Sequence, residues 1–293
     1  MPAESARVVT PALLRELPLP EPGADKNANG RLLVVGGSVR SPGAVRLSGE
    51  AALRSGAGKV SLATVAPVLA GLGPLVPEAA LVPLPTDRAG AIDLEEVDQV
   101  VAETDGADVV LAGPGLVDPE HAVALLTRLV RDLDAVLVVD GLASAFLTEN
   151  PGGLHHLQGR VVLTANPVEL ARTAHLTVED VERDPAAAAV RVARECRVVV
   201  VCGGTAKHVA TPEGETWLVE GGSRGLAASG SGDVHSGIVA GLLARGTDPV
   251  RAAIWGAYVH ARCGERLAAS IGTVGFLARE LPGEIPAVLR ELD

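Results

Sequence analysis

The chain has 293 residues, 47% hydrophobic and 21% charged, a composition that supplies a sizeable core and excludes general disorder. Its formal net charge of −11 argues against nucleic acid or an anionic membrane as partner, because both bind basic surfaces. We therefore expect small-molecule ligands and one domain over 1–293, with 1–25 as an N-terminal surface segment. Three cysteines without metal or disulfide spacing, and no signal-peptide pattern, predict a cytoplasmic protein.

Buried strands alternate with helices along the chain. A short helix is expected around 11–17, and a strand beginning at Arg31 breaks at Gly36-Gly37 before a helix over 44–55. Further strands are predicted at 59–63, 81–84, 109–112, 135–140, from 160, and at 197–202, and further helices at 94–102, 185–195, 238–244 and 251–268. Segments 208–211 and 216–219 predict an antiparallel hairpin. The pattern indicates an α/β fold with a mostly parallel sheet.

Glycines follow three of these strands, at Gly36-Gly37, Gly113-Pro114-Gly115 and Gly203-Gly204. In a parallel sheet, ligands gather at the carboxyl ends of the strands. One shared crevice explains the three glycine-rich ends better than three unrelated turns do.

The stretch 225–237 is dense in small residues and leads directly into the apolar run 238–243. Bare backbone at a helix start lets N–H groups and the helix dipole converge on an anion, so this stretch predicts a phosphate cradle. Asp233 falls on the first turn, where a carboxylate beside a polyphosphate suggests a base. The alternative is an ordinary helix cap after a flexible loop.

The run Gly230-Ser231-Gly232-Asp233 with Gly237 resembles the anion hole and catalytic aspartate of ribokinase-like small-molecule kinases. Across about 26–281 the motifs together resemble the ADP-dependent NAD(P)H-hydrate dehydratase family, also called carbohydrate-kinase-related. The resemblance implies a ribokinase-like three-layer α/β/α sandwich with a mostly parallel sheet and no separate lid domain.

In that family the nucleotide phosphorylates a ring hydroxyl of hydrated NADH or NADPH, and loss of phosphate restores the double bond. The resemblance implies ADP (or ATP) as phosphate donor, Mg²⁺, and a homo-oligomer, by family a tetramer. It makes Asp233 the catalytic residue, which also contacts the substrate. The implied nucleotide contacts are Cys202, Gly203, Gly204, Thr205, Gly230, Ser231 and Gly232. The implied substrate contacts are Ala44, Gly113, Gly115 and Asn166.

The chain departs from the family pattern near this site. Cys202 stands where a phosphate-binding lysine is expected, and Lys207 is the nearest substitute in sequence. Asn166 replaces a histidine, and with Pro167 and Glu169 it also forms a capping-box pattern. The remaining departures are at Leu142, Ala228 and Ser229.

Other polar residues have less specific interpretations. Asp140, at the end of a predicted strand, could contact substrate or metal or could cap a helix. His260, His155 and His156 show no metal-ligand spacing and are expected at surface or satisfied core positions.

Two other functions remain open from the sequence. One is an ATP-dependent vitamin or sugar kinase of the same fold, which would stop after phosphorylation. The other is a nucleotide-binding regulator with weakened catalysis, which the departures at the proposed site would explain.

Overall fold

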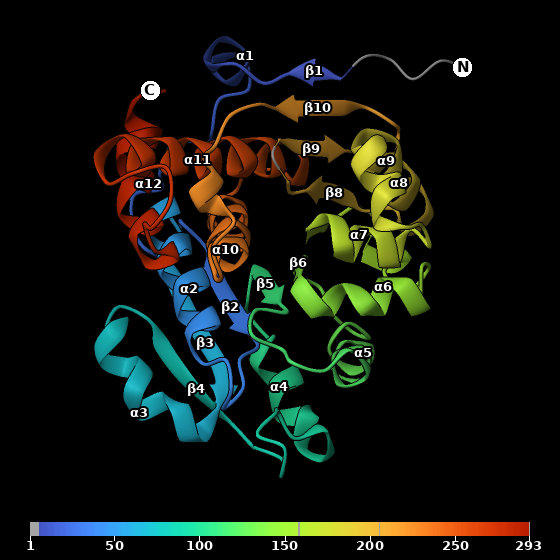
Figure 1. Cartoon of the computed structure of the whole chain (residues 1–293). Coiled ribbons are helices and arrows are strands. Elements are labelled where there is room, and N and C mark those ends of the chain that lie inside the picture. Colours follow the sequence, from blue (N-terminus) through green and yellow to red (C-terminus); the bar gives the residue numbers. More distant parts are fainter. Residues whose placement is uncertain (1–5, 158, 205, 293) are drawn as a thin grey trace.

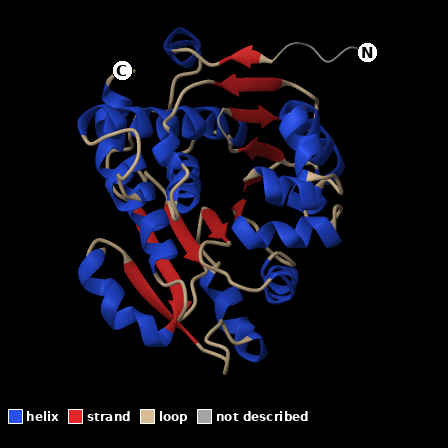
Figure 2. Cartoon of the chain, viewed as in Figure 1, coloured by secondary structure: helices blue, strands red, loops and turns tan. Residues whose placement is uncertain are grey.

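The computed structural model of the chain describes residues 6–157, 159–204 and 206–292. Its ten strands form one sheet with the spatial order β1-β10-β9-β8-β7-β6-β5-β2-β3-β4, and helices cover the sheet on both sides (Figure 1, Figure 2). The strands are β1 (Arg7–Val8), β2 (Arg31–Val35), β3 (Lys59–Val65), β4 (Ala80–Leu84), β5 (Val109–Ala112), β6 (Val136–Asp140), β7 (Val161–Ala165), β8 (Val199–Cys202), β9 (Lys207–Ala210) and β10 (Thr216–Val219).

Among the described strands, only β9 runs antiparallel to its neighbours, β8 and β10. The predicted hairpin is confirmed, with Ala210 opposite Thr216. The remaining neighbours pair in parallel, so the expectation of a mostly parallel sheet is also confirmed. Parallel pairing brings the carboxyl ends of β2 and β5 to β8 to the same edge of the sheet.

The helices form two layers, and the three-layer sandwich is confirmed. One layer packs with the apolar cluster that contains Leu111 and Val138, and the other with the cluster that contains Val110 and Leu137. The first layer holds α1 (Pro11–Glu16), α2 (Gly43–Ser55), α3 (Leu69–Leu72), α10 (Ser231–Ala244), α11 (Pro249–Ser270) and α12 (Leu281–Arg290). The second holds α4 (Val97–Glu103), α5 (Pro119–Leu129), α6 (Ala145–Glu149), α7 (Pro167–Thr173), α8 (Val178–Arg183) and α9 (Pro185–Cys196).

Adjacent strand residues alternate between the two clusters because successive side chains of a strand point to opposite faces. Both faces are covered by helices, so the central strands are apolar throughout, as in β5, whose four residues are all buried. No described helix combines the length and the apolar character needed to cross a membrane.

The N-terminal segment is more integrated than a surface segment. Strand β1 extends the sheet beside β10, with Arg7 opposite Trp217. In α1, Leu14 is fully buried, and the indole N–H of Trp255 donates to the Leu17 carbonyl oxygen at 2.8 Å. The prolines and charged residues of this segment had suggested a surface position.

Helix α10 crosses α2 at very close range. A Cβ atom on Gly237 would collide with the backbone of Ser48, and one on Gly241 would lie 2.5 Å from the Ala52 carbonyl oxygen. Glycine is therefore required on this face of α10. The helix begins at Ser231, earlier than the predicted 238, directly after Gly230 with its φ of 88°.

We expect Gly241→Ala to lower the free energy of unfolding by about 1–3 kcal/mol, because the added methyl overpacks the α2–α10 contact. Gly283→Ala is the matched control, since a Cβ there meets nothing within 4 Å; it should leave stability unchanged or raise it by less than about 1 kcal/mol. Urea unfolding of both variants measures the difference, and equal stabilities would contradict the packing account.

Candidate active site

A cavity of about 670 Å³ lies where the carboxyl ends of β6, β7 and β8 meet the N-terminus of α10. The residues that line it are 140–141, 164–167, 169, 203–204, 207, 221–224, 226–227, 230–233, 235 and 260. A crevice therefore exists at the strand ends, but of the three glycine-rich ends expected to share it only Gly203-Gly204 lines it. Gly203 and Gly204 are part of it, as are Gly230, Ser231 and Gly232.

Asp233 lies in the first turn of α10 and is partly buried. Burial raises the pKa of its carboxyl to about 6, and the negative charge of Glu169 adds to the rise. Such a carboxyl is mostly ionised at neutral pH and still basic enough to take a proton from a hydroxyl during reaction.

Asp140 lies beside Asp233 at the end of β6 and is 7% exposed. The Thr164 hydroxyl donates to its Oδ1 at 2.7 Å and the Ser236 hydroxyl to its Oδ2 at 3.1 Å. Burial and the charge of Asp233 raise the pKa of Asp140 well above its usual range. Both carboxyls therefore hold their protons more strongly than an exposed aspartate does, and perturbed titratable groups in a cavity mark a candidate functional site.

The start of α10 is open to a ligand. A Cβ built on Gly232 meets nothing within 4 Å. The Ser231 N–H donates to the Ala228 carbonyl oxygen at 3.1 Å, and in the described part of the chain no loop or side-chain acceptor takes the N–H groups of Gly232 and Asp233. Unpartnered N–H groups at a helix start are suited to binding an anion.

The glycine pair after β8 forms another part of the wall. The Gly203 N–H donates to the Ala165 carbonyl oxygen at 2.7 Å, which ties this turn to the end of β7. Gly204 has a φ of 154°, which an L side chain rarely adopts. Thr205, predicted as a nucleotide contact, lies outside the described residues.

The side chain of Cys202 does not line the cavity, and its predicted nucleotide contact is corrected. It is 1% exposed and packs in the apolar cluster under α7 and α9, and its thiol donates to the Gly203 carbonyl oxygen at 3.4 Å. Burial raises the pKa of this thiol to about 12. The residue faces the helix layer because side chains alternate along β8, and only the turn after it reaches the cavity.

Asn166 both lines the cavity and caps α7. Its Oδ1 accepts from the N–H groups of Val168 (2.9 Å) and Glu169 (3.0 Å), and Glu169 Oε2 accepts from the Asn166 N–H at 2.9 Å. The predicted capping box is confirmed. Contact between Asn166 and substrate stays a prediction.

Ala44, Gly113 and Gly115, predicted to contact substrate, lie next to the cavity but do not line it. A Cβ on Gly115 would lie 2.9 Å from the Ala44 Cβ and 3.0 Å from the Gly37 Cα, so these residues are gathered at the ends of β2 and β5. A Cβ on Gly113 would collide with the Asp140 carbonyl oxygen. They form a patch on the Asp140 side of the cavity.

Three basic residues lie in the cavity wall. Lys207 was considered above as the substitute for the phosphate-binding lysine, whereas His235 and His260 were not predicted as site residues. Lys207, His235 and His260 are 5%, 6% and 4% exposed. Nε2 of His260 lies 3.0 Å from both the hydroxyl and the carbonyl oxygen of Ser231, and because a carbonyl only accepts, Nε2 carries a proton. Nδ1 of His260 has no described partner, so the expectation of a satisfied core histidine is corrected.

The signal for His235 was available, since it stands two residues after Asp233 in the same motif. His260 lies 29 residues away from Ser231, and only the packing of α11 on α10 brings the two together. Spacing along the sequence could not show that contact.

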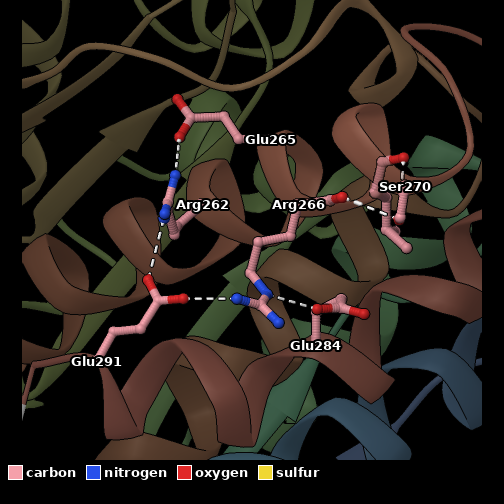
Figure 3. A network of polar contacts seen from close by, with 7 residues as sticks. Arg262, Glu265, Arg266, Ser270, Glu284 and Glu291 are labelled. Atoms are coloured by element: carbon pink, nitrogen blue, oxygen red, sulfur yellow. Dashed lines mark hydrogen bonds and ion pairs between the residues drawn. The ribbon is translucent and has the colours of Figure 1, made fainter.

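The loop 221–224 closes the cavity on the α11 side. Glu265 of α11 accepts from the Gly222 N–H at 3.0 Å, and Ser223 donates to the Thr273 carbonyl oxygen at 3.0 Å. Glu265 also binds Arg262 and so joins an ion-pair network between α11 and the C-terminal residues (Figure 3). The loop is therefore held from behind by charged side chains.

The charges around the cavity fit a nucleotide carried with Mg²⁺. Asp140, Glu169 and Asp233 all have raised pKa values, with burial as the first cause. The charges of Asp233 and Glu169 raise the pKa of Asp140 further, and the charge of Glu169 raises that of Asp233 further. A divalent cation carried by the phosphates would offset this negative charge. Among the described residues, no group of three or more His, Cys, Asp or Glu side chains is arranged to hold a metal ion.

Solved structures with the same arrangement exist. A ribokinase-like superfamily protein from Enterococcus faecalis aligns with a TM-score of 0.81 at 26% identity, covering 98% of this chain and 96% of that one. An ADP/ATP-dependent NAD(P)H-hydrate dehydratase from Bacillus subtilis, co-crystallised with ATP and Mg²⁺, aligns with a TM-score of 0.82 at 26% identity, covering 99% and 100%. The ribokinase-like fold is confirmed.

Sequence comparison gives the same family. The ADP-dependent (S)-NAD(P)H-hydrate dehydratase of Xanthomonas campestris is 43% identical over 98% of this chain and 97% of its own length. The chain spans 54% of the bifunctional NAD(P)H-hydrate repair enzyme of Moorella thermoacetica, at 35% identity. The family model described as NAD(P)H-hydrate dehydratase matches residues 32–287. The chain therefore belongs to the NAD(P)H-hydrate dehydratase family.

Proposed function

We propose that the chain catalyses the ADP-dependent dehydration of (S)-NAD(P)H hydrate, which gives NAD(P)H, AMP and phosphate. The observation that carries the proposal is Asp233, a carboxyl with a pKa of about 6 beside the open N–H groups at the start of α10. A base and an anion cradle within one helical turn are what phosphoryl transfer to a hydroxyl requires. Membership of the family supplies the substrate.

The proposed reaction has two steps. Asp233 takes the proton of the substrate hydroxyl as the hydroxyl oxygen attacks the terminal phosphorus of ADP, and AMP leaves. The C–O bond of the resulting phosphate ester then breaks, the ring loses a proton, and the double bond of the nicotinamide returns with release of phosphate. The N–H groups of Gly230 and Gly232 stabilise the negative charge on the transferred group, whereas the Ser231 N–H already donates to the Ala228 carbonyl oxygen.

The proposed ligand contacts follow the cavity wall. The nucleotide lies along Gly203-Gly204 and the start of α10, with Thr205 as a further contact. The hydrated nicotinamide lies on the Asp140 side, near Gly113, Gly115 and Ala44, where it reaches both Asp233 and Asn166. Mg²⁺ supplies charge neutralisation on the phosphates.

We further propose a single-domain, cytoplasmic homo-oligomer, a tetramer by resemblance to the family. Three free cysteines, all buried, suit a reducing compartment. Ile271, Val274 and Leu277 are 54%, 67% and 45% exposed on one short segment, which supports a contact between subunits there.

With hydrated NADPH, ADP and Mg²⁺, the protein should restore the absorbance of NADPH and release AMP and phosphate in equal amounts. If the absorbance of NADPH recovers with ATP but not with ADP, the phosphate donor is ATP and the dehydratase activity stands. Phosphorylation of hydroxymethylpyrimidine, thiazole alcohol or pyridoxal with ATP, without any NADPH recovery, would establish the kinase instead. Binding of AMP with no activity in any of these assays would establish the regulator.

Asp233→Asn should lower turnover by about two to four orders of magnitude, the usual contribution of a general base. The amide keeps the shape of the carboxyl, so folding and ADP binding should change little. Turnover in the coupled assay and ADP affinity by calorimetry test this pair of outcomes. A variant with near wild-type turnover would remove Asp233 from the role of base.

The pH profile of kcat/KM should fall about tenfold per pH unit below about pH 6, because the base works only when ionised and its pKa is about 6. Glu169→Gln removes a negative neighbour and keeps a capping side chain. The acid limb should then move to lower pH, since loss of that charge lets the pKa of Asp233 fall. An acid limb that stays in place in Glu169→Gln would show that another group titrates.

A further inference from the structure

Lys207 is a buried cation to which the two-step reaction above assigns no task. It is the first residue of β9, is 5% exposed, and lines the cavity. Within the described part of the chain its ammonium forms no hydrogen bond and no ion pair; only Glu265 acts on it, at longer range. Burying an unpaired ammonium group is costly, so the position favours a ligand that supplies the missing acceptor.

The charges of the cavity are separated into two sides. The carboxyls of Asp140, Glu169 and Asp233 act on one another, as their raised pKa values show. On the other side, the positive charge of Lys207 lowers the pKa values of His235 and His260 further than burial alone does. The acidic side suits a base and a metal ion, and the basic side suits an anion.

The basic side is also rich in polar atoms without partners. The rings of His235 and His260 lie 5.1 Å apart between centroids, and Nε2 of His235 and Nδ1 of His260 have no described partner. His260 holds Ser231, the first residue of α10, against this group. The ammonium of Lys207 would repel a metal ion here, so a ligand with several acceptor oxygens fits better.

We propose that Lys207 and the first turn of α10 at Ser231 form an inner subsite for one phosphoryl group. Its oxygens come either from the terminal phosphate of ADP or from the phosphate that the reaction releases. The proposal rests on the proposed function for the identity of its ligand. It adds a residue that distinguishes ADP from AMP, because only ADP carries a phosphate beyond the one bound to the nucleoside.

The test compares wild type, Lys207→Met and the control Lys59→Met. Lys59 is the first residue of β3, and five strands lie between β3 and β9 in the sheet, so the control removes the same charge far from the cavity. Calorimetry gives the affinities for ADP, for AMP, and for inorganic phosphate with AMP present. Lys207→Met should weaken ADP binding about ten- to hundredfold, the range for a charge-assisted hydrogen bond, and leave AMP binding unchanged.

The arms separate the two sources of the phosphoryl group. Weaker ADP binding assigns the subsite to the terminal phosphate of the nucleotide, and weaker phosphate binding beside AMP, with ADP unaffected, assigns it to the released product. Unchanged affinity for ADP and phosphate would overturn the subsite, and so would an equal loss for ADP and AMP. None of these measurements depends on turnover. If the wild-type protein shows no dehydratase activity and Lys207→Met still weakens binding as expected, the result overturns the proposed dehydration and leaves the phosphoryl subsite in place.

Thermal unfolding adds a readout that a structural lysine would not give. Without ligand, Lys207→Met should melt at the same temperature as wild type or higher, because an unpaired buried charge has been removed. A lower melting temperature would show that Lys207 stabilises the fold, and it would overturn the proposal. If Lys207→Met is poorly soluble, Lys207→Gln, which keeps a neutral donor of similar reach, takes its place in every arm.

Discussion

Helix α10 lies against α2 at a distance that only glycine permits, with Gly237 against Ser48 and Gly241 against Ala52. The Ser48 hydroxyl adds a bond to the Asp233 carbonyl oxygen at 2.9 Å, directly between the two helices. Because α10 carries both the proposed base Asp233 and the unpartnered N–H groups at its start, helix packing behind the cavity fixes their position. Both groups thus lie on a rigid helix, which positions reacting groups more accurately than a loop would.

The same placement puts the N-terminus of α10 between acidic and basic side chains. Asp233 in its first turn lies near Asp140 at the end of β6 and Glu169 in the first turn of α7. Ser231 contacts His260 of α11. A phosphoryl group at this helix start therefore has acids on one side and a lysine on the other. Such a division lets one cavity hold a nucleotide phosphate and still keep a nearby carboxyl basic.

Sequence patterns predicted the features that depend on local order. Continuous apolar runs mark strands buried on both faces, and the run from Gly230 to Asp233 lines the cavity at the start of a helix, as its pattern indicated. The pattern did not identify α5, although Asp118 followed by Pro119 is the same start signal as Asp248 followed by Pro249, which was recognised.

Features that depend on the phase of a strand or on tertiary packing were not predictable. Strand β8 begins at Val199, two residues after the predicted start, and which face Cys202 takes depends on how β8 sits between its two helix layers. Lys207 enters the cavity because β9 turns back beside β8 and places His208 opposite Cys202. His260 meets Ser231 only through the packing of two helices. The spacing of residues along the sequence does not reveal contacts of this kind.

The ion pairs behind the loop 221–224 reach almost to the end of the chain. Glu265, which holds the Gly222 N–H, is bound by Arg262, and Arg262 is bound in turn by Glu291, just beyond α12 (Figure 3). These side chains are partly exposed, so dissolved salt screens them while the buried side of the cavity keeps its charges. Ionic strength therefore acts on one wall of the cavity through ion pairs that lie outside it, although no residue of α12 lines the cavity.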